Sequence, residues 1–264
     1  MIGKSGMKRF DVTEKIIFNN KFYSGKAEKY GVIMYGANYI LKKEAGKDQL
    51  YKLCAEYFAA ILGQSINVSI QKVLFCWYKG KPALMIEDFL MPGDEFVPLG
   101  GILEEQKDLE EEKSKYTYDN FLDIVYSNVR IVEKEETIKK FWLMLILDFL
   151  ISNKARNASN IGFIKRRGVI RLAPVFDNSS GFCFDQSVDM HMLFQGKKQS
   201  RLDILKHFES DEKMYAINYF KENLSEKLLD SLLREIKEID PFVEEVFRKI
   251  VFERFTSIIS LGED

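Results

Sequence analysis

Two oxygen-bearing side chains flank a predicted hairpin in the second half of the chain. Asn160 stands before the apolar run at residues 161–164, and Asp177 ends the run APVFD that follows the hairpin. Amide and carboxylate oxygens are ligands that Mg²⁺ prefers, and in phosphoryl transfer this ion bridges the phosphates of ATP. Asn and Asp are also common turn formers. Their joint presence at one hairpin nevertheless favours a metal site at Asn160 and Asp177.

A lysine and a glutamate upstream have the residue types that bind and orient nucleotide phosphates. Lys42 lies at the end of a predicted strand, and Glu56 lies on the polar side of a predicted helix at 48–62. In phosphotransferases a strand lysine neutralises the phosphates and a helix-borne carboxylate orients that lysine. Lys42 could equally be a solvated strand end, the adjacent Lys43 could take its place, and Glu56 could be a plain surface residue.

The loop before Asn160 contains the third chemical feature. A long apolar helix predicted at 137–151 ends in Ser152-Asn153, and Asn160 follows seven residues later. This spacing is typical of a loop that carries a catalytic base and a metal-holding amide. Residue 155, however, is alanine, which has no carboxylate to accept a hydroxyl proton or to orient a nucleophile.

These motifs together resemble the HipA-like serine/threonine kinases. That family writes its catalytic loop approximately as N-x-D-R-H-x-x-N-x-G-F/L, and residues 153–163 (NKARNASNIGF) align with it without a gap. The family's later L-A-P-x-Y/F-D-N-x-S motif matches residues 172–178 and Ser180. The resemblance covers essentially the whole chain, and the two motifs around Asn160 and Asp177 are its most specific part.

Upstream segments extend the resemblance and imply further nucleotide-binding residues. The family's phosphate-covering loop, G-x-x-E-K, resembles residues 25–29, and Lys42 and Glu56 occupy its ATP lysine and helix glutamate. Residues 87–89, followed by Pro92-Gly93, resemble its hinge. The cofactor-binding residues implied are Gly25, Lys26, Ala27, Glu28, Lys29, Lys42, Glu56, Glu87, Asp88 and Phe89. The resemblance also implies ATP and Mg²⁺ as cofactors, and a serine or threonine of a protein, including the chain itself, as acceptor.

Three positions depart from the family pattern. The catalytic aspartate falls on Ala155, the neighbouring histidine on Asn157, and the regulatory serine of the phosphate loop on Phe22. We therefore expect the chain to retain nucleotide binding and to have strongly reduced phosphoryl transfer. Two hypotheses follow: a kinase silenced by an Asp→Ala change at position 155, or a natural pseudokinase that acts through protein contacts.

The elements that position these residues form a predicted α+β, two-lobed protein-kinase-like fold. Turn glycines at 25, 31 and 36 predict short strands in 16–40, and a helix at 48–62 is expected to end at Gly63. Further strands are predicted at 68–77 and 82–89, and the proline- and glycine-rich stretch 90–101 marks the lobe boundary. The predicted lobes are residues 1–90 and 91–264. The larger lobe is expected to contain helices at 121–129 and 137–151, a hairpin in 162–184, and helical segments from 201 onward with breaks at 210–211 and 240–241.

Composition and motifs disfavour several other functions. Thirty-nine basic residues against forty acidic ones give no global field toward nucleic acid or membrane. The apolar run 141–151 is far shorter than the roughly 20 residues of a spanning helix. Two histidines without ligand-spaced partners disfavour a zinc enzyme, no G-x-S-x-G elbow is present, and the three cysteines lie in apolar stretches. We expect a soluble protein of the bacterial cytoplasm; the resemblance alone suggests export into host cells without a signal peptide.

Overall fold

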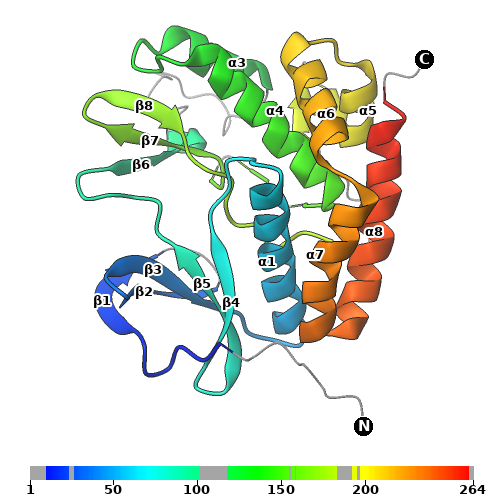
Figure 1. Cartoon of the computed structure of the whole chain (residues 1–264). Coiled ribbons are helices and arrows are strands. Elements are labelled where there is room, and N and C mark those ends of the chain that lie inside the picture. The colour runs from blue at the N-terminus through cyan, green and yellow to red at the C-terminus, as the bar shows by residue number, and fades with distance from the viewer. Residues whose placement is uncertain are drawn as a thin grey trace.

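The computed structural model describes residues 10–23, 27–101, 118–154, 156–157, 159–182, 192–194 and 197–261. A five-stranded antiparallel sheet forms the first part of the molecule, with strand order β1-β2-β3-β5-β4 (Figure 1). The strands are β1 (Ile17–Phe22), β2 (Glu28–Met34), β3 (Ala37–Lys43), β4 (Val73–Tyr78) and β5 (Lys81–Glu87). The expected small antiparallel sheet is therefore present, although β4 begins five residues later than predicted.

Two-residue turns close the tight hairpins of the structure. Tyr35-Gly36 joins β2 to β3, and Lys79-Gly80 joins β4 to β5; both residues of each pair have positive φ. Glycine adopts this conformation without steric cost, and such turns match the twist of the flanking strands. The prediction of a turn at Gly36 is confirmed. The prediction at Gly31 is wrong, because Gly31 lies inside β2, paired with Ile40.

Helix α1 (Gln49–Ser65) packs against β4 and β5 of the sheet and against helix α7. The predicted end at Gly63 is wrong, because the helix continues two residues further and its C-cap is Ile66. Gly63 serves packing instead: a Cβ at this position would lie 2.8 Å from Cγ2 of Ile70. The glycine therefore lets the segment before β4 approach the helix closely.

The chain forms a second, three-stranded sheet, which lies above the first sheet in the view of Figure 1. Its order is β6-β7-β8, with β6 (Glu95–Pro98), β7 (Gly162–Arg166) and β8 (Val169–Leu172). The hairpin β7-β8 was predicted, but β6 was not, because residues 90–101 resemble a linker in composition. A Cβ at Gly162 would lie 2.4 Å from the Phe96 ring, so glycine allows β6 to cross this point.

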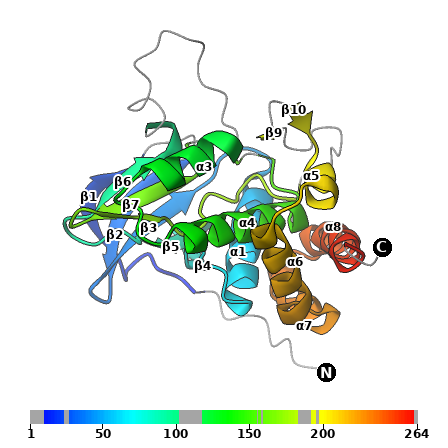
Figure 2. The same cartoon turned by 90° about the horizontal axis from the view of Figure 1, so that it is seen from above.

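The remaining elements are mainly helices, and those that follow residue 200 lie on the side of the molecule away from β1 in both views (Figure 2). They are α3 (Tyr118–Ser127), α4 (Lys134–Leu150), α5 (Arg201–His207), α6 (Asp211–Asn223), α7 (Glu226–Ile239) and α8 (Pro241–Ile259), with the short strands β9 (Met192–Phe194) and β10 (Lys197–Gln199). Ser210 and Asp240 cap α6 and α8 with their side chains, which confirms the predicted helix breaks.

Two groups of apolar side chains make the core. The larger is continuous from α1, β4 and β5 into α4, α7 and α8, and Phe182 stacks on Phe247 within it, with ring centroids 3.7 Å apart. The smaller lies on the other face of the five-stranded sheet and includes Val32, Leu41 and Met85. Twelve of the seventeen residues of α4 are buried, including all of 141–150, as predicted for the central helix. Because the first sheet is covered on both faces, alternate residues of β3 point to different environments.

Candidate functional site

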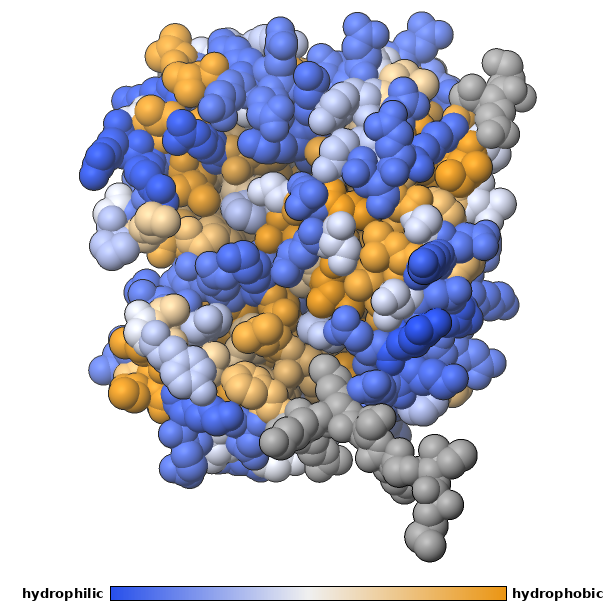
Figure 3. All heavy atoms as spheres, in the orientation of Figure 1, coloured by the Kyte–Doolittle hydropathy of each residue, from blue (hydrophilic) through white to orange (hydrophobic). Residues whose placement is uncertain are grey.

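A cavity of about 290 Å³ lies where the two sheets and helix α1 meet, and residues from all three line it. On the face seen in Figure 3, apolar residues are exposed in the hollow between hydrophilic side chains of the two sheets. Its polar lining residues are Tyr23, Lys29, Lys42, Glu56, Gln71, Asp88, Ser159, Asn160 and Asp177, and its apolar lining residues are Ile40, Ile86, Phe89, Leu90, Phe96 and Phe176. One part of this cavity is therefore charged and another is apolar and aromatic.

Lys42 is the centre of the charged part. Its Nζ lies 2.5 Å from Oε2 of Glu56 on α1, 3.3 Å from Oδ1 of Asp177 and 3.4 Å from Oε1 of Glu44. The Lys42 and Glu56 side chains are 1% and 3% exposed, whereas that of Asp177 is 37% exposed. One ammonium therefore faces three carboxylates, and the most accessible of the three is Asp177.

The surroundings of this cluster shift its ionisation in opposite directions. Burial raises the pKa of Glu56, an effect that Lys42 opposes and Asp177 reinforces. Burial alone would raise the pKa of Asp177, but Lys42, Lys29 and Arg156 hold that pKa below its usual value. Burial likewise opposes the charge of Lys42, but the carboxylates around it raise its pKa overall. Asp177 is thus an anion held beside a firmly charged lysine.

The structure also distinguishes the two adjacent lysines at the end of β3. Successive strand residues point to opposite faces of a sheet. Lys42 points toward α1 and the cavity, whereas Lys43 points outward and pairs with Glu28 at 2.5 Å. Of the two lysines, only Lys42 lines the cavity.

Asn160 and Asp177 line the same cavity from two separate segments. Asn160 Oδ1 accepts a hydrogen bond of 2.7 Å from the backbone N–H of Asn157. Asp177 has a φ of 56°, in the left-handed region that aspartate tolerates better than most residues. The pair that was predicted to flank the hairpin is therefore brought to one cavity.

Arg156 connects these two segments through its whole guanidinium group. Nε and Nη2 donate to the two carboxylate oxygens of Asp148 at 2.8 and 2.9 Å. Nη1 donates to the carbonyls of Asn160 and Phe176 at 3.0 and 2.7 Å, and Nη2 also donates to Oδ1 of Asn178 at 2.6 Å. All five N–H donors of an arginine are used. Arg156 thereby holds both neighbours of Asp177 and the backbone of Asn160 in one frame.

The carboxylate that completes this frame is Asp148, in the last turn of α4. Its side chain is fully buried and also accepts 2.8 Å from Nδ2 of Asn153. A lone carboxylate in an apolar helix requires such partners, because burying a charge is costly unless it is paired. The sequence carries this signal, because Asp148 is the single charged residue within the apolar run 141–151.

The predicted hinge contains two carboxylates, of which Asp88 lines the cavity and Glu87 does not. Asp88 is 4% exposed, and its Oδ2 accepts from Tyr23 Oη at 2.8 Å and from Lys21 Nζ at 3.2 Å. Burial and Asp88 raise the pKa of Tyr23, so the phenol stays a donor. The Glu87 side chain instead pairs with Lys72 at 3.1 Å, at the surface.

Several predicted cofactor residues do not line the cavity. Ala27 and Glu28 are described but contribute no lining, and Glu28 is paired with Lys43 on the outer face. Gly25, Lys26 and Ala155 lie outside the described residues. The phosphate-loop role of residues 25–29, the hinge role of residues 87–89 and the catalytic position of Ala155 stay predictions.

Sequence reasoning missed most of the apolar lining and three polar lining residues, Tyr23, Gln71 and Ser159. A signal was available for Ile40, because it lies two residues before Lys42 on the same strand and must share its face. Ile86 pairs with Ile40 across the two strands. Phe89, Phe96 and Phe176 contact one another, with ring centroids 5.5–6.2 Å apart. These aromatic residues come from three segments, so no local pattern could reveal the cluster.

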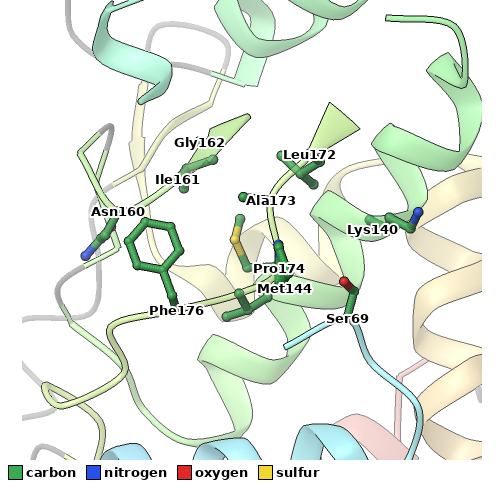
Figure 4. Close-up of a pocket in the computed structure, with 11 residues that line it drawn as sticks. Ser69, Lys140, Met144, Asn160, Ile161, Gly162, Leu172, Ala173, Pro174 and Phe176 are labelled. Carbon is green, nitrogen blue, oxygen red and sulfur yellow. The ribbon is translucent and has the colours of Figure 1, made fainter. Parts of the chain in front are cut away.

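A second, much smaller cavity lies behind Asn160 and Phe176. In Figure 4 the Phe176 ring stands between Asn160 and the Ala173-Pro174 segment, and Met144 and Lys140 approach from α4. Its volume of about 10 Å³ is close to that of a single water probe. It therefore cannot hold a substrate. The 290 Å³ cavity is the candidate site because Lys42, Asn160 and Asp177 line it.

Other chemistry receives little support from the described residues. Burial raises the pKa of both the Cys54 and the Cys76 thiol to about 12, so neither provides a thiolate nucleophile. Cys183 and His191 lie outside the described part of the chain. No helix in the described ranges is both long and apolar enough to cross a bilayer.

Comparisons with known proteins agree with this geometry. The family model of the HipA-like C-terminal domain matches residues 12–241 of this chain. Serine/threonine-protein kinase CtkA of Helicobacter pylori strain J99 is 26% identical over 239 residues, which cover 79% of this chain and 71% of that protein. The resemblance inferred from the sequence motifs is thus confirmed.

Solved structures show the same fold. The crystal structure of the H. pylori proinflammatory kinase CtkA has a TM-score of 0.82 at 20% identity, covering 96% of each chain. HipA of Shewanella oneidensis MR-1, solved with HipB and operator DNA, has a TM-score of 0.50 at 14% identity; the match covers 97% of this chain and 65% of that one. The predicted α+β, two-lobed kinase-like fold is confirmed.

Proposed function

The chain belongs to the family of HipA-like C-terminal domains. We propose that it has the fold and the nucleotide-binding site of a serine/threonine protein kinase. Its 290 Å³ cavity binds Mg-ATP, and alanine at position 155 silences phosphoryl transfer in this chain. The observation that carries the proposal is the buried Lys42–Glu56 pair, at 2.5 Å, with Asp177 3.3 Å from the same ammonium. Lysine, helix glutamate and metal-side aspartate are the parts that phosphoryl transfer requires.

In this proposal the two parts of the cavity bind the two parts of the nucleotide. The base lies against the apolar side chains of Ile40, Ile86 and Phe89, which line one part of the cavity. The phosphates lie against Lys42, whose ammonium is oriented by Glu56. Residues 25–29 cover the phosphates with backbone amides, and residues 87–89 form the hinge after which we place the lobe boundary.

The donor set around Asp177 fits Mg²⁺. Within the described residues, no group of three or more His, Cys, Asp or Glu side chains is arranged to hold a metal ion by itself. Mg²⁺ in nucleotide sites commonly takes one or two protein oxygens and completes its shell with phosphates and water. Asp177 and Asn160 would supply those protein oxygens. When bound, the ion neutralises charge on the phosphates.

Ala155 removes the group that would position the acceptor hydroxyl. The carboxylate of Asp148, seven residues earlier, cannot replace it, because both of its oxygens are bound by Arg156 in a fully buried frame. The chain therefore keeps the proposed nucleotide-binding residues and lacks a general base at this position.

The deciding experiment measures transfer of labelled γ-phosphate from Mg-ATP to the chain itself and to a generic protein acceptor. We expect no transfer from the unmodified chain, transfer from Ala155→Asp, and no transfer from Ala155→Asp/Asp177→Ala. Nucleotide binding by calorimetry is measured alongside for all three proteins. Absence of nucleotide binding in the unmodified chain would refute the proposal as a whole.

A second candidate is a natural pseudokinase that binds nucleotide and acts through protein contacts. The observation in its favour is Ala155 itself, next to an otherwise complete site. It predicts nucleotide binding without transfer from either the unmodified chain or Ala155→Asp. The two candidates thus differ in the behaviour of one variant.

A further inference from the structure

Gln71 is a polar residue whose side chain lines the apolar part of the cavity, and the proposed function assigns it no role. It lies just before β4, and its residue is 9% exposed. Its backbone N–H donates 2.9 Å to the carbonyl of Val175, which fixes the residue against the segment leading to Asp177. Its side chain lines the cavity together with Ile40 and Ile86.

The orientation of the Gln71 amide is set by its neighbour. Nε2 donates 3.0 Å to the backbone carbonyl of Glu87, the first residue of the predicted hinge. A carbonyl can only accept a hydrogen bond, so the amide nitrogen must face Glu87. Consequently Oε1 is the end of the amide that can face the cavity, and no donor from the described residues bonds to it.

We propose that Gln71 determines which nucleotide base the cavity accepts. Oε1 accepts a hydrogen bond from the exocyclic 6-amino group of an adenine base that lies against the side chains of Ile40 and Ile86, which are neighbours on one face of the sheet. The inference rests on the proposed function, because it concerns the base of the nucleotide in that same cavity.

The fixed polarity of the amide gives selection against 6-oxo purines. A free glutamine could rotate its amide and donate to a 6-oxo group, but that rotation would place Oε1 against the Glu87 carbonyl. Two acceptors would then face each other in a buried site, and neither would be satisfied. A guanine base is therefore rejected in either orientation of the side chain.

The test compares nucleotides that differ only at this contact. Calorimetry measures the affinities of Mg-ATP, Mg-GTP and the triphosphate of purine riboside, which lacks the 6-amino group, for the unmodified chain. We expect purine riboside triphosphate to bind about 3- to 10-fold more weakly than ATP, the value of one buried hydrogen bond. GTP should bind at least about 10-fold more weakly, because it adds the clash of two acceptors.

Gln71→Met keeps the length of the side chain and removes the acceptor, so ATP and purine riboside triphosphate should bind this variant within about 2-fold of each other. Gln64→Met makes the same chemical change at an exposed position on α1 and should keep the preference for ATP. Gln71→Leu replaces the methionine variant if the latter does not fold.

Two results would overturn the inference while leaving the proposed function intact: equal binding of ATP and purine riboside triphosphate to the unmodified chain, or an unchanged preference in both Gln71 variants. Absence of binding by all three nucleotides would overturn the inference and the proposed function together.

Discussion

Lys42 and Arg156 are both buried cations, 1% and 3% exposed, and both contact the segment around Asp177. Their surroundings differ in charge balance. Arg156 has one carboxylate partner, Asp148, and its remaining donors reach neutral oxygens. Lys42 has three carboxylates within 3.4 Å, and one of them is partly exposed to the cavity.

This difference in charge balance separates a cluster that supports the backbone, around Arg156, from a cluster that can bind a ligand, around Lys42. In the Arg156 frame every donor is satisfied and the charges cancel, so nothing in it attracts a ligand. Around Lys42 the negative charge exceeds the positive charge of the ammonium, and Lys29 on the cavity wall offsets only part of it. Such an imbalance favours a cation at Asp177. We infer that the first cluster holds the backbone in place and that the second is completed by nucleotide and metal.

The largest effect is expected from breaking the balanced cluster. Arg156→Met leaves the buried carboxylate of Asp148 without its counter-charge, and removing one partner of such a pair typically costs about 3–5 kcal/mol. We expect a loss of that size in the free energy of unfolding, measured by urea denaturation. The double variant Arg156→Met/Asp148→Leu should recover part of it, because no unpaired charge remains.

Arg248→Met provides the matched control for the arginine variant. Arg248 donates to Glu244 and Asp230, but its side chain is 42% exposed. Solvent-exposed pairs contribute little, so this variant should lose less than about 1 kcal/mol. Equal losses in the Arg156 and Arg248 variants would show that the buried frame has no special structural role.

The second largest effect concerns the neighbouring lysines of β3. Lys42→Met should weaken Mg-ATP binding by about 10- to 100-fold, because it removes a charge-assisted contact to phosphate. Lys43→Met should leave the affinity within about 2-fold, since Lys43 lies on the opposite face of the sheet. Calorimetry with adenosine, which lacks phosphates, serves as a control and should show no difference between the variants. Comparable losses of ATP affinity at both positions would refute the assignment of Lys42.

These lysines also illustrate what the sequence could predict. The sequence predicted a strand that ends near residue 42, but the choice between Lys42 and Lys43 stayed open. It depends on which face of the sheet packs against α1, and that is decided by tertiary contacts. The hairpin turns and the breaks before α6 and α8 were predictable because single residue types impose them locally.

The features that were missed depend on residues distant in sequence. Strand β6 has the composition of a linker, and it becomes a strand only because β7, more than sixty positions later, offers it an edge. Gly63 has the residue type of a helix cap, but its place in the structure is set by the close approach of Ile70, seven residues later. Arg156 was aligned within a motif, yet its contacts with Asp148, Phe176 and Asn178 could not be inferred from spacing.

A smaller effect is expected at Asp177, and it tests the unbalanced cluster directly. Asp177→Asn should lower the affinity for ATP about 10-fold in Mg²⁺ and change it little in EDTA, because the carboxylate acts through the ion. The free energy of unfolding without nucleotide should change by less than about 1 kcal/mol. Removing Asp177 loses its attraction to Lys42 but also relieves its repulsion of Glu56. An unchanged effect of Mg²⁺ on ATP binding would refute Asp177 as a metal ligand.

The smallest effect is a pH dependence of stability caused by Glu56. Burial raises the pKa of Glu56 in the folded chain above its ordinary value of 4.5. Between these two values the folded state binds more protons than the unfolded state, so the free energy of unfolding falls as pH rises. The contribution is fully present below pH 4.5 and is lost as pH rises through the folded pKa, with a slope of at most about 1.4 kcal/mol per pH unit.

Glu56→Gln should remove this slope, because glutamine does not titrate. Urea denaturation of both proteins from pH 4 upward would measure the difference between their free energies of unfolding. The lysine partner does not disturb the comparison, since the pKa of Lys42 is raised from an already high ordinary value and its proton is lost only at strongly alkaline pH. A difference that stays constant with pH would show that Lys42 fully offsets the burial of Glu56, and that the cluster is as well balanced as the frame around Arg156.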